Sequence, residues 1–303
     1  YFEDFGDASG EVTAPNRPKI VRILMASLVC YRSATMISMP KPTPRFSSQT
    51  IPFLLKAGRQ KRPDWLDRNR EEYERVLQAP LTHLAQRLVS ELRPLAPDYH
   101  FPLKGLGRIK RTANSAEQYG SLYKNWMSYS AARPRESRFE HNPNIFFLLN
   151  SEDPDDSVLI AGGLYMPSSR QTRALRETIA NDASAFEALF ASKDFARCFR
   201  GGFSAEKISS RPTRGHDPNH PRMHWLRLQA FFVWRPYSKR EFTSRDFPAL
   251  VVRDAKQILR LNRLLEDALQ GRLAPAPRKG TQKPSQLLDR LQDLSPVAHK
   301  ADF

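Results

Sequence analysis

The spacing of apolar residues changes twice along this chain of 303 residues. Between residues 65 and 92 they recur every three or four positions, as on one face of an amphipathic helix, and they do so again between 247 and 269. Short runs rich in β-branched and aromatic residues stand between, at 144–150, 157–166 and 228–237, each bounded by turn residues. This order predicts an α+β domain: a single antiparallel sheet packed by helices from the N-terminal and C-terminal flanks.

Turn and helix-capping residues predict further elements between residues 107 and 192. The stretch "NSEDPDD" at 150–156 separates two apolar runs and predicts an antiparallel hairpin. The short run "GRIKR" at 107–111 is expected to be a further strand. Helices are expected at 168–182, where Ser168 or Ser169 would cap the first turn, and at 182–192.

The composition of the two ends sets the expected domain limits. "MPKPTPRFSSQ" at 39–49 holds three prolines and is typical of a linker, so residues 1–45 are expected to be disordered or a non-genuine N-terminal extension. The single α+β domain should then span residues 46–270. Residues 271–303 are expected to form a linker and a short amphipathic C-terminal helix. Whether residues 285–294 dock on their own domain or bind a partner stays open.

Several classes of protein are excluded by composition. The hydrophobic fraction of 40% is that of a globular chain, and no run approaches the ~20 apolar residues that span a bilayer. Only two cysteines occur, which favours a reducing compartment, and we therefore expect a cytoplasmic protein. No dinucleotide fingerprint, Walker loop, H-E-x-x-H or G-x-S-x-G motif is present, so no cofactor is predicted.

The net charge of +16 lies mostly in the body of the chain. Residues 1–45 contribute +2 and residues 271–303 contribute +3, which leaves +11 for residues 46–270. A basic body attracts anions such as nucleic acid, acidic lipid headgroups or phosphorylated metabolites. The charge alone does not choose between these partners and a surface that merely keeps the protein soluble.

Three segments, in order, resemble a family known only as domain of unknown function 2461. They are "DWLDRNREEYERVLQAPL", "AGGLYMP" at 161–167, and "RPTRGHDPNHP" with the following "LRLQAFFVWRPYS". The resemblance covers about residues 46–270. It implies a single α+β domain of unassigned activity and supplies no reaction.

One segment departs from the family pattern. The family's strand Arg-Ile-Tyr-Arg is usually followed by Asp-x-Arg-Phe-Ser and then by Tyr-Lys. Here Arg108, Ile109 and Arg111 match the strand, and Tyr123 and Lys124 match the later pair. The run "TANSAEQYGSL" between them lacks the Asp, Arg and Phe. If this loop builds the family's site, the site is altered or lost in this chain.

The first candidate site consists of Arg108, Arg111, Tyr123 and Lys124. On a strand, Ile109 and Arg111 share a face, so Arg111 is expected to be buried and to need a carboxylate or a bound anion. A guanidinium with a Tyr hydroxyl and a Lys suits a phosphate or carboxylate ligand. A structural salt bridge at Arg111 is the alternative.

The second candidate is the pair Gly162 and Gly163 inside the run at 157–166. Glycine within a strand marks a bulge or a close approach of another group to the backbone. The pair is therefore a candidate ligand-binding position, and tight packing of a helix is the alternative.

The third candidate is "RGHDPNHPRMHW" at 214–225, with His216, His220 and His224 four residues apart. Such spacing on one helix face could hold zinc or iron. Pro218 directly after Asp217 instead predicts that Asp217 caps a helix beginning at Pro218, which leaves His216 outside it. We predict no metal site. His220 remains a candidate general acid or base, since its ordinary pKa is near 6.5.

The leading hypothesis is a domain that binds an anionic ligand, with Arg108, Arg111, Lys124 and His220 lining one site. Whether it is also an enzyme acting on that ligand stays open. The alternatives are a nucleic-acid-binding or protein-interaction module and a metal-dependent hydrolase. A nucleic-acid-binding module would show a basic stripe with exposed aromatic side chains.

Overall fold

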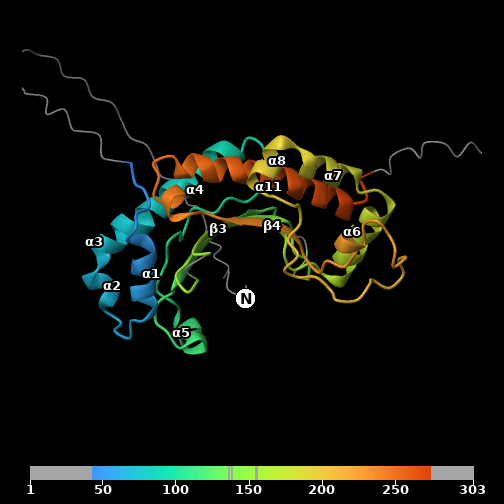
Figure 1. The fold of residues 1–303 in the computed structure, drawn as a ribbon. Helices are drawn as coiled ribbons and strands as arrows, with labels where there is room; N and C mark the ends of the chain where they lie inside the picture. The colour runs from blue at the N-terminus through green and yellow to red at the C-terminus, as the bar shows by residue number, and fades with distance from the viewer. Residues whose placement is uncertain (1–42, 136, 138, 154–155, 274–303) are drawn as a thin grey trace, which may run out of the picture. The chain divides into compact units, whose positions relative to one another are not determined.

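The fold is known from a computed structural model, which describes residues 43–135, 137, 139–153 and 156–273, within one unit that begins at Thr43. In this part of the chain, one four-stranded antiparallel sheet is packed by helices that precede and follow it in the sequence (Figure 1). The predicted α+β class with a single antiparallel sheet is therefore confirmed.

The strands follow one another in the sheet as they do in the sequence. They are β1 (Trp126–Ala132), β2 (Asn144–Asn150), β3 (Val158–Leu164) and β4 (Phe231–Pro236). The order is β1-β2-β3-β4, and every neighbouring pair is antiparallel. The predicted hairpin at 150–156 joins β2 to β3 and is confirmed.

The two faces of the sheet differ in burial. Along β1 and β2, residues alternate strictly between buried and half-buried, as period-2 strands do when one face packs on a core. The buried face carries large apolar side chains, among them Phe147, Leu149 and Ile160. Helix α11 (Phe247–Leu269) lies along this face (Figure 1), and α4 (Ala79–Leu92) packs against α11.

The other helices precede the sheet, lie between β3 and β4, or follow β4 in the sequence. Before it come α1 (Thr50–Gly58), α2 (Trp65–Arg68), α3 (Arg70–Tyr73), the π-helical turn η1 (Glu74–Gln78) and α5 (Ala113–Tyr119). After β3 come α6 (Ser169–Asn181), α7 (Ser184–Ala191), α8 (Lys193–Cys198), α9 (Met223–Leu226) and α10 (Lys239–Phe242).

Local sequence signals explain where α6 and α11 begin. Ser168 caps α6: its side chain accepts a hydrogen bond from the Gln171 backbone N–H, and the Gln171 side chain bonds back to the Ser168 backbone. This reciprocal pair is a capping box, and it confirms the predicted start of the helix. The long helix predicted at 247–269 is α11, whose Pro248 stands in the first turn, where a missing N–H costs nothing.

Two predictions about local structure are wrong. Residues 107–111 do not form a strand of the sheet; Lys110 makes only an isolated antiparallel bridge with Tyr123. The helix expected to begin at Pro218 begins at Met223. The Asp217 side chain accepts a hydrogen bond from the Asn219 N–H at 2.9 Å, so it stabilises a turn and does not cap the helix.

The predicted domain limits remain predictions. The segments expected to be an extension (1–45) and a linker with a terminal helix (271–303) lie almost entirely outside the described residues. Of the described helices, none is both long and apolar enough to cross a membrane.

Candidate functional site

Within the described residues, a cluster of cations without ion-pair partners lies where residues 109–111 run antiparallel to residues 122–124, just before β1. The Arg111 N–H donates to the Leu122 carbonyl at 3.0 Å, and the Lys124 N–H donates to the Ile109 carbonyl at 2.9 Å. Residues that alternate along such a ribbon point to opposite faces. Arg111 and Lys124 therefore share one face, and Lys110 and Tyr123 share the other.

Tyr123 belongs to the structural face of this ribbon. Its side chain is fully buried, and its hydroxyl donates to the Pro63 carbonyl at 2.8 Å and lies 3.1 Å from the Arg62 carbonyl. The same hydroxyl accepts from the Leu66 backbone N–H at 3.4 Å. The Tyr123 hydroxyl thus links the ribbon to the segment before α2. Its hydrogen bonds are used within the protein, which leaves none for a ligand.

Arg111 and Lys124 lie on the other face, and each stacks on an aromatic ring. The Arg111 guanidinium lies 4.3 Å from the centre of the Tyr119 ring, and the Lys124 ammonium lies 5.0 Å from the centre of the Trp126 ring. Arg111 Nε also donates to Ser121 Oγ at 3.3 Å. Tyr119 and Ser121 come from the segment that departs from the family pattern, so this segment holds Arg111 in place.

We call Arg108, Arg111 and Lys124 the cationic cluster. In the ranges that the structure describes, none of the three is within ion-pair distance of an Asp or Glu carboxylate. Burial, followed by the charges of Arg111 and Arg108, lowers the pKa of Lys124. Burial also lowers the pKa of Arg111, although Tyr119 and Glu152 act in the opposite direction. Within the described residues the cluster is therefore a group of cations without an ion-pair partner, and Glu152 acts on Arg111 only from a longer distance.

His220 does not join this cluster. Its Nε2 lies 3.3 Å from the Ala180 carbonyl of α6, and its Nδ1 accepts from the Arg222 N–H at 3.1 Å. Lys124 precedes β1 at one end of the sheet, whereas α6 follows β3 at the other end (Figure 1). A seven-residue strand is roughly 20 Å long, so the two positions are far apart. A catalytic role for His220 stays a prediction, and its geometry is that of a link between a loop and α6.

Packing and backbone conformation explain the two glycines without a ligand. A Cβ on Gly162 would lie 2.0 Å from Ile258 Cγ2 of α11, so the close approach of this helix requires glycine there. Gly163 has a φ of +113°, which other residues rarely adopt. A role of the two glycines in ligand binding stays a prediction.

The three histidines of residues 214–225 do not converge on a common point with acidic side chains. Within the described residues, no group of three or more His, Cys, Asp or Glu side chains is close enough together to hold a metal ion. His224 is exposed and contacts the Trp225 ring, with 5.2 Å between the ring centres.

Two further cations, which the sequence reasoning did not single out, lie at the α6 end of the sheet. The Lys207 ammonium lies 3.6 Å from the centre of the Tyr165 ring. Arg176 Nη2 donates to the Leu228 carbonyl at 2.8 Å, and burial lowers the pKa of Arg176. In the described part of the chain neither forms an ion pair. The sequence gives little indication of a special role for Arg176 or Lys207, since each is one of many polar residues in a helix or a loop.

A surface pocket of about 450 Å³ lies elsewhere, between the β1–β2 connection, α6 and the end of α11. Its charges balance one another: Arg133, Arg135 and Arg170 stand against Asp98, Glu140 and Glu266. Arg133 contacts Asp98 at 2.7 Å and Glu266 at 3.1 Å, and Arg170 forms a bidentate pair with Glu140. We therefore do not place the anion site there.

Glu266 at the edge of this pocket is expected to make stability depend on pH. Its side chain is 6% exposed and accepts from the Tyr99 hydroxyl at 2.7 Å; burial raises its pKa above the ordinary 4.5. A carboxyl with a raised folded-state pKa contributes stability below pH 4.5 that is lost as the pH rises through the raised value. Glu266→Gln should therefore gain stability relative to the wild type between pH 4 and pH 7 in urea unfolding.

Glu91 is the matched control for this prediction. It accepts a hydrogen bond from Lys256 at 2.8 Å, which lowers its pKa. Its contribution is present above the ordinary pKa of 4.5 and is lost as the pH falls below it, so Glu91→Gln should lose stability relative to the wild type as the pH rises to 4.5 and should show no further change up to pH 7. Parallel curves for the two variants would contradict the assignment.

The fold and the cluster together define a class: an α+β domain whose single sheet is covered by helices on one face and which, in the described ranges, carries cations without ion-pair partners at one end. The family model described as "Conserved hypothetical protein (DUF2461)" matches residues 49–263, well over half of the chain. The chain belongs to this family, and the resemblance noted in the sequence is confirmed. Neither a curated protein nor a solved structure matches it.

Proposed function

We propose that the protein binds an anionic ligand, bearing phosphate or carboxylate groups, at the cationic cluster. The observation that carries the proposal is the absence, in the described ranges, of any carboxylate in ion-pair contact with Arg108, Arg111 or Lys124. Like charges held together cost free energy, and a bound anion would offset that cost.

The chemistry of the side chains favours phosphate or carboxylate over a simple halide. A guanidinium offers parallel N–H donors that match two oxygens of such a group, and an ammonium adds a compact charge. The stacking of Arg111 on Tyr119 and of Lys124 on Trp126 supports both side chains from one side. The proposal concerns binding; it assigns no reaction.

Calorimetric titration of the full chain with pyrophosphate tests this proposal. Hydrogen bonds to charged groups contribute about 1.5–3 kcal/mol each, so Arg111→Gln should weaken binding about tenfold or more. Lys124→Gln should also weaken it. Arg260→Gln removes the same charge from an exposed position on α11, across the sheet, and should change affinity only slightly. Equal effects of Arg111→Gln and Arg260→Gln would refute the site.

A further inference from the structure

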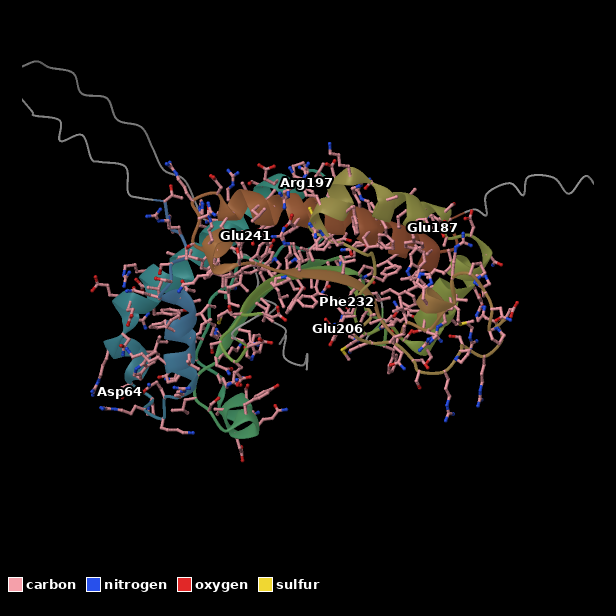
Figure 2. The ribbon with its side chains drawn as sticks, viewed as in Figure 1. Asp64, Glu187, Arg197, Glu206, Phe232 and Glu241 are labelled. Carbon is pink, nitrogen blue, oxygen red and sulfur yellow. The ribbon has the colours of Figure 1, made fainter. Side chains whose placement is uncertain are left out.

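The face of the sheet opposite α11 has a composition unlike an ordinary core-facing surface. In the described part of the chain no helix lies across it (Figure 1). Figure 2 shows Phe232 and Glu206 on this side of the sheet, away from α11. We call it the open face. Aromatic, apolar and small polar side chains are combined there: Trp126, Ser128, Ser130, Asn144, Leu148, Asn150, Leu159, Ala161 and Trp234 are half-buried, and Phe232 is buried.

Aromatic rings continue this face beyond the end of β3. Tyr165 is 44% exposed and meets the Phe232 ring edge-on, with 5.0 Å between the ring centres. Met166 beside it is 43% exposed. Trp126 at the other end of the sheet and Trp234 near the middle are half-buried. Rings that keep part of their surface accessible on one face form a platform on which flat groups can stack.

Positive charge stands at both ends of the open face. The segment 104–124, which contains the cationic cluster, has five Lys or Arg residues and one Glu. The segment 200–227 has six Lys or Arg residues, one Asp and one Glu, and it also carries a net charge of +4. The second segment is fixed beside β4, since the Ser204 N–H donates to the Phe232 carbonyl at 2.8 Å. Lys207 reaches the open face there, over Tyr165.

We infer that the open face binds a single strand of nucleic acid, with phosphates at the cations of the two ends and bases stacked on the rings between them. Base stacking on aromatic side chains and a basic path for the backbone are what single-strand binding requires. The seven-residue strands separate the two cationic ends by roughly 20 Å, which a few nucleotides can span. Ser and Asn side chains between the rings offer donors and acceptors to base edges.

Single strands fit this face better than a duplex does. A duplex hides the faces of its bases inside the stack, so the aromatic rings of the open face would have nothing to stack on. This inference rests on the proposed function, because the cationic cluster that binds the anion would here hold a phosphate of the strand.

Fluorescence anisotropy of the full chain with labelled 12-mers of deoxythymidine and uridine tests the inference. Both should bind, and a duplex of the same length should bind more weakly. Each single-strand phosphate contact contributes about −0.7 to the slope of log affinity against log salt, so Lys207→Gln should make this slope shallower by about that amount. Lys239→Gln, on exposed α10, is the matched control and should leave the slope unchanged.

The aromatic variants separate stacking from charge. Trp126→Leu and Tyr165→Leu should each weaken oligonucleotide binding about 5- to 100-fold. Tyr165 is exposed, so its replacement keeps the test valid if the Trp126 variant fails to fold. The same variants should weaken binding of linear polyphosphate by less than they weaken oligonucleotide binding, because this polyanion has no bases and loses only the support that the two rings give to Lys124 and Lys207.

The two proposals fail in different ways. Equal binding of polyphosphate and oligonucleotide, with no effect of Tyr165→Leu, would overturn the nucleic-acid inference and leave the anion site standing. Binding of pyrophosphate without any binding of oligonucleotide would do the same. Binding of neither pyrophosphate nor oligonucleotide would overturn both proposals.

Discussion

Replacing Asp254 with alanine is expected to destabilise the folded protein by about 3 kcal/mol or more, because it removes one of the two carboxylates that pair with the part-buried Arg235 and leaves the buried Tyr237 hydroxyl without its acceptor. The Asp254 side chain is fully buried. Its Oδ2 accepts from the Tyr237 hydroxyl at 3.0 Å and lies 3.2 Å from Arg235 Nη1. Its Oδ1 lies 2.8 Å from Arg253 Nη2. Arg235 is only 17% exposed and would keep Glu241 as its one acidic partner.

Urea unfolding of Asp254→Ala measures this cost. Asp267 is the matched control: it pairs with Arg272 at 2.6 Å, but both side chains are well exposed. Exposed pairs contribute about 0–1 kcal/mol, so Asp267→Ala should have a small effect. Unfolding free energies of the two variants that agree within about 0.5 kcal/mol would show that the Asp254 network does not stabilise the fold.

The same network, together with burial, disfavours the thiolate form of Cys198. Burial, followed by a hydrogen bond with Asp254, raises the pKa of the Cys198 thiol to about 11. The thiol therefore stays protonated at neutral pH, and the thiolate is the reactive form.

The parts of the fold that could be predicted from the sequence are those with a strong period and clear ends. The run 144–150 is β2 and the run 247–269 is α11, because buried alternation and a long apolar stripe are each sustained to a turn or a cap. Strand β1 was missed. Its sequence, "WMSYSAA", alternates Ser and Ala with larger residues, and small side chains weaken the period-2 signal.

The candidate site could be predicted only in part. The match to the family's strand and its Tyr-Lys pair identified Arg108, Arg111 and Lys124. The three side chains lie close enough for their charges to interact. The sequence around His220 could not show whether this residue lies near the cluster. The distance in space between two segments depends on the length of the strands between them and on the sheet topology. The same limit applies to Lys207, whose place over Tyr165 depends on the segment that runs beside β4.

Gly162→Ala is the second variant with a large expected effect. Gly162 lies on the face of β3 that α11 covers, and an alanine Cβ would stand 2.0 Å from Ile258 Cγ2 and 2.8 Å from the Asn144 carbonyl oxygen. Neither partner can move freely: Ile258 is fully buried, and Asn144 belongs to the neighbouring strand. Overpacking of a core costs about 1–3 kcal/mol and occasionally more, and we expect the upper end here.

A double-mutant cycle with Ile258→Ala shows whether this contact is the cause. Ile258→Ala alone should cost about 2–5 kcal/mol by leaving a cavity under the sheet. In its presence, Gly162→Ala should cost at least about 1 kcal/mol less than it does in the wild type, because the methyl group that the new Cβ meets is gone. Part of the cost should remain, since the Asn144 carbonyl stays in place. Additive costs would mean that Gly162 is required for a reason other than the approach of α11, and the ligand-binding alternative for this glycine would then gain support.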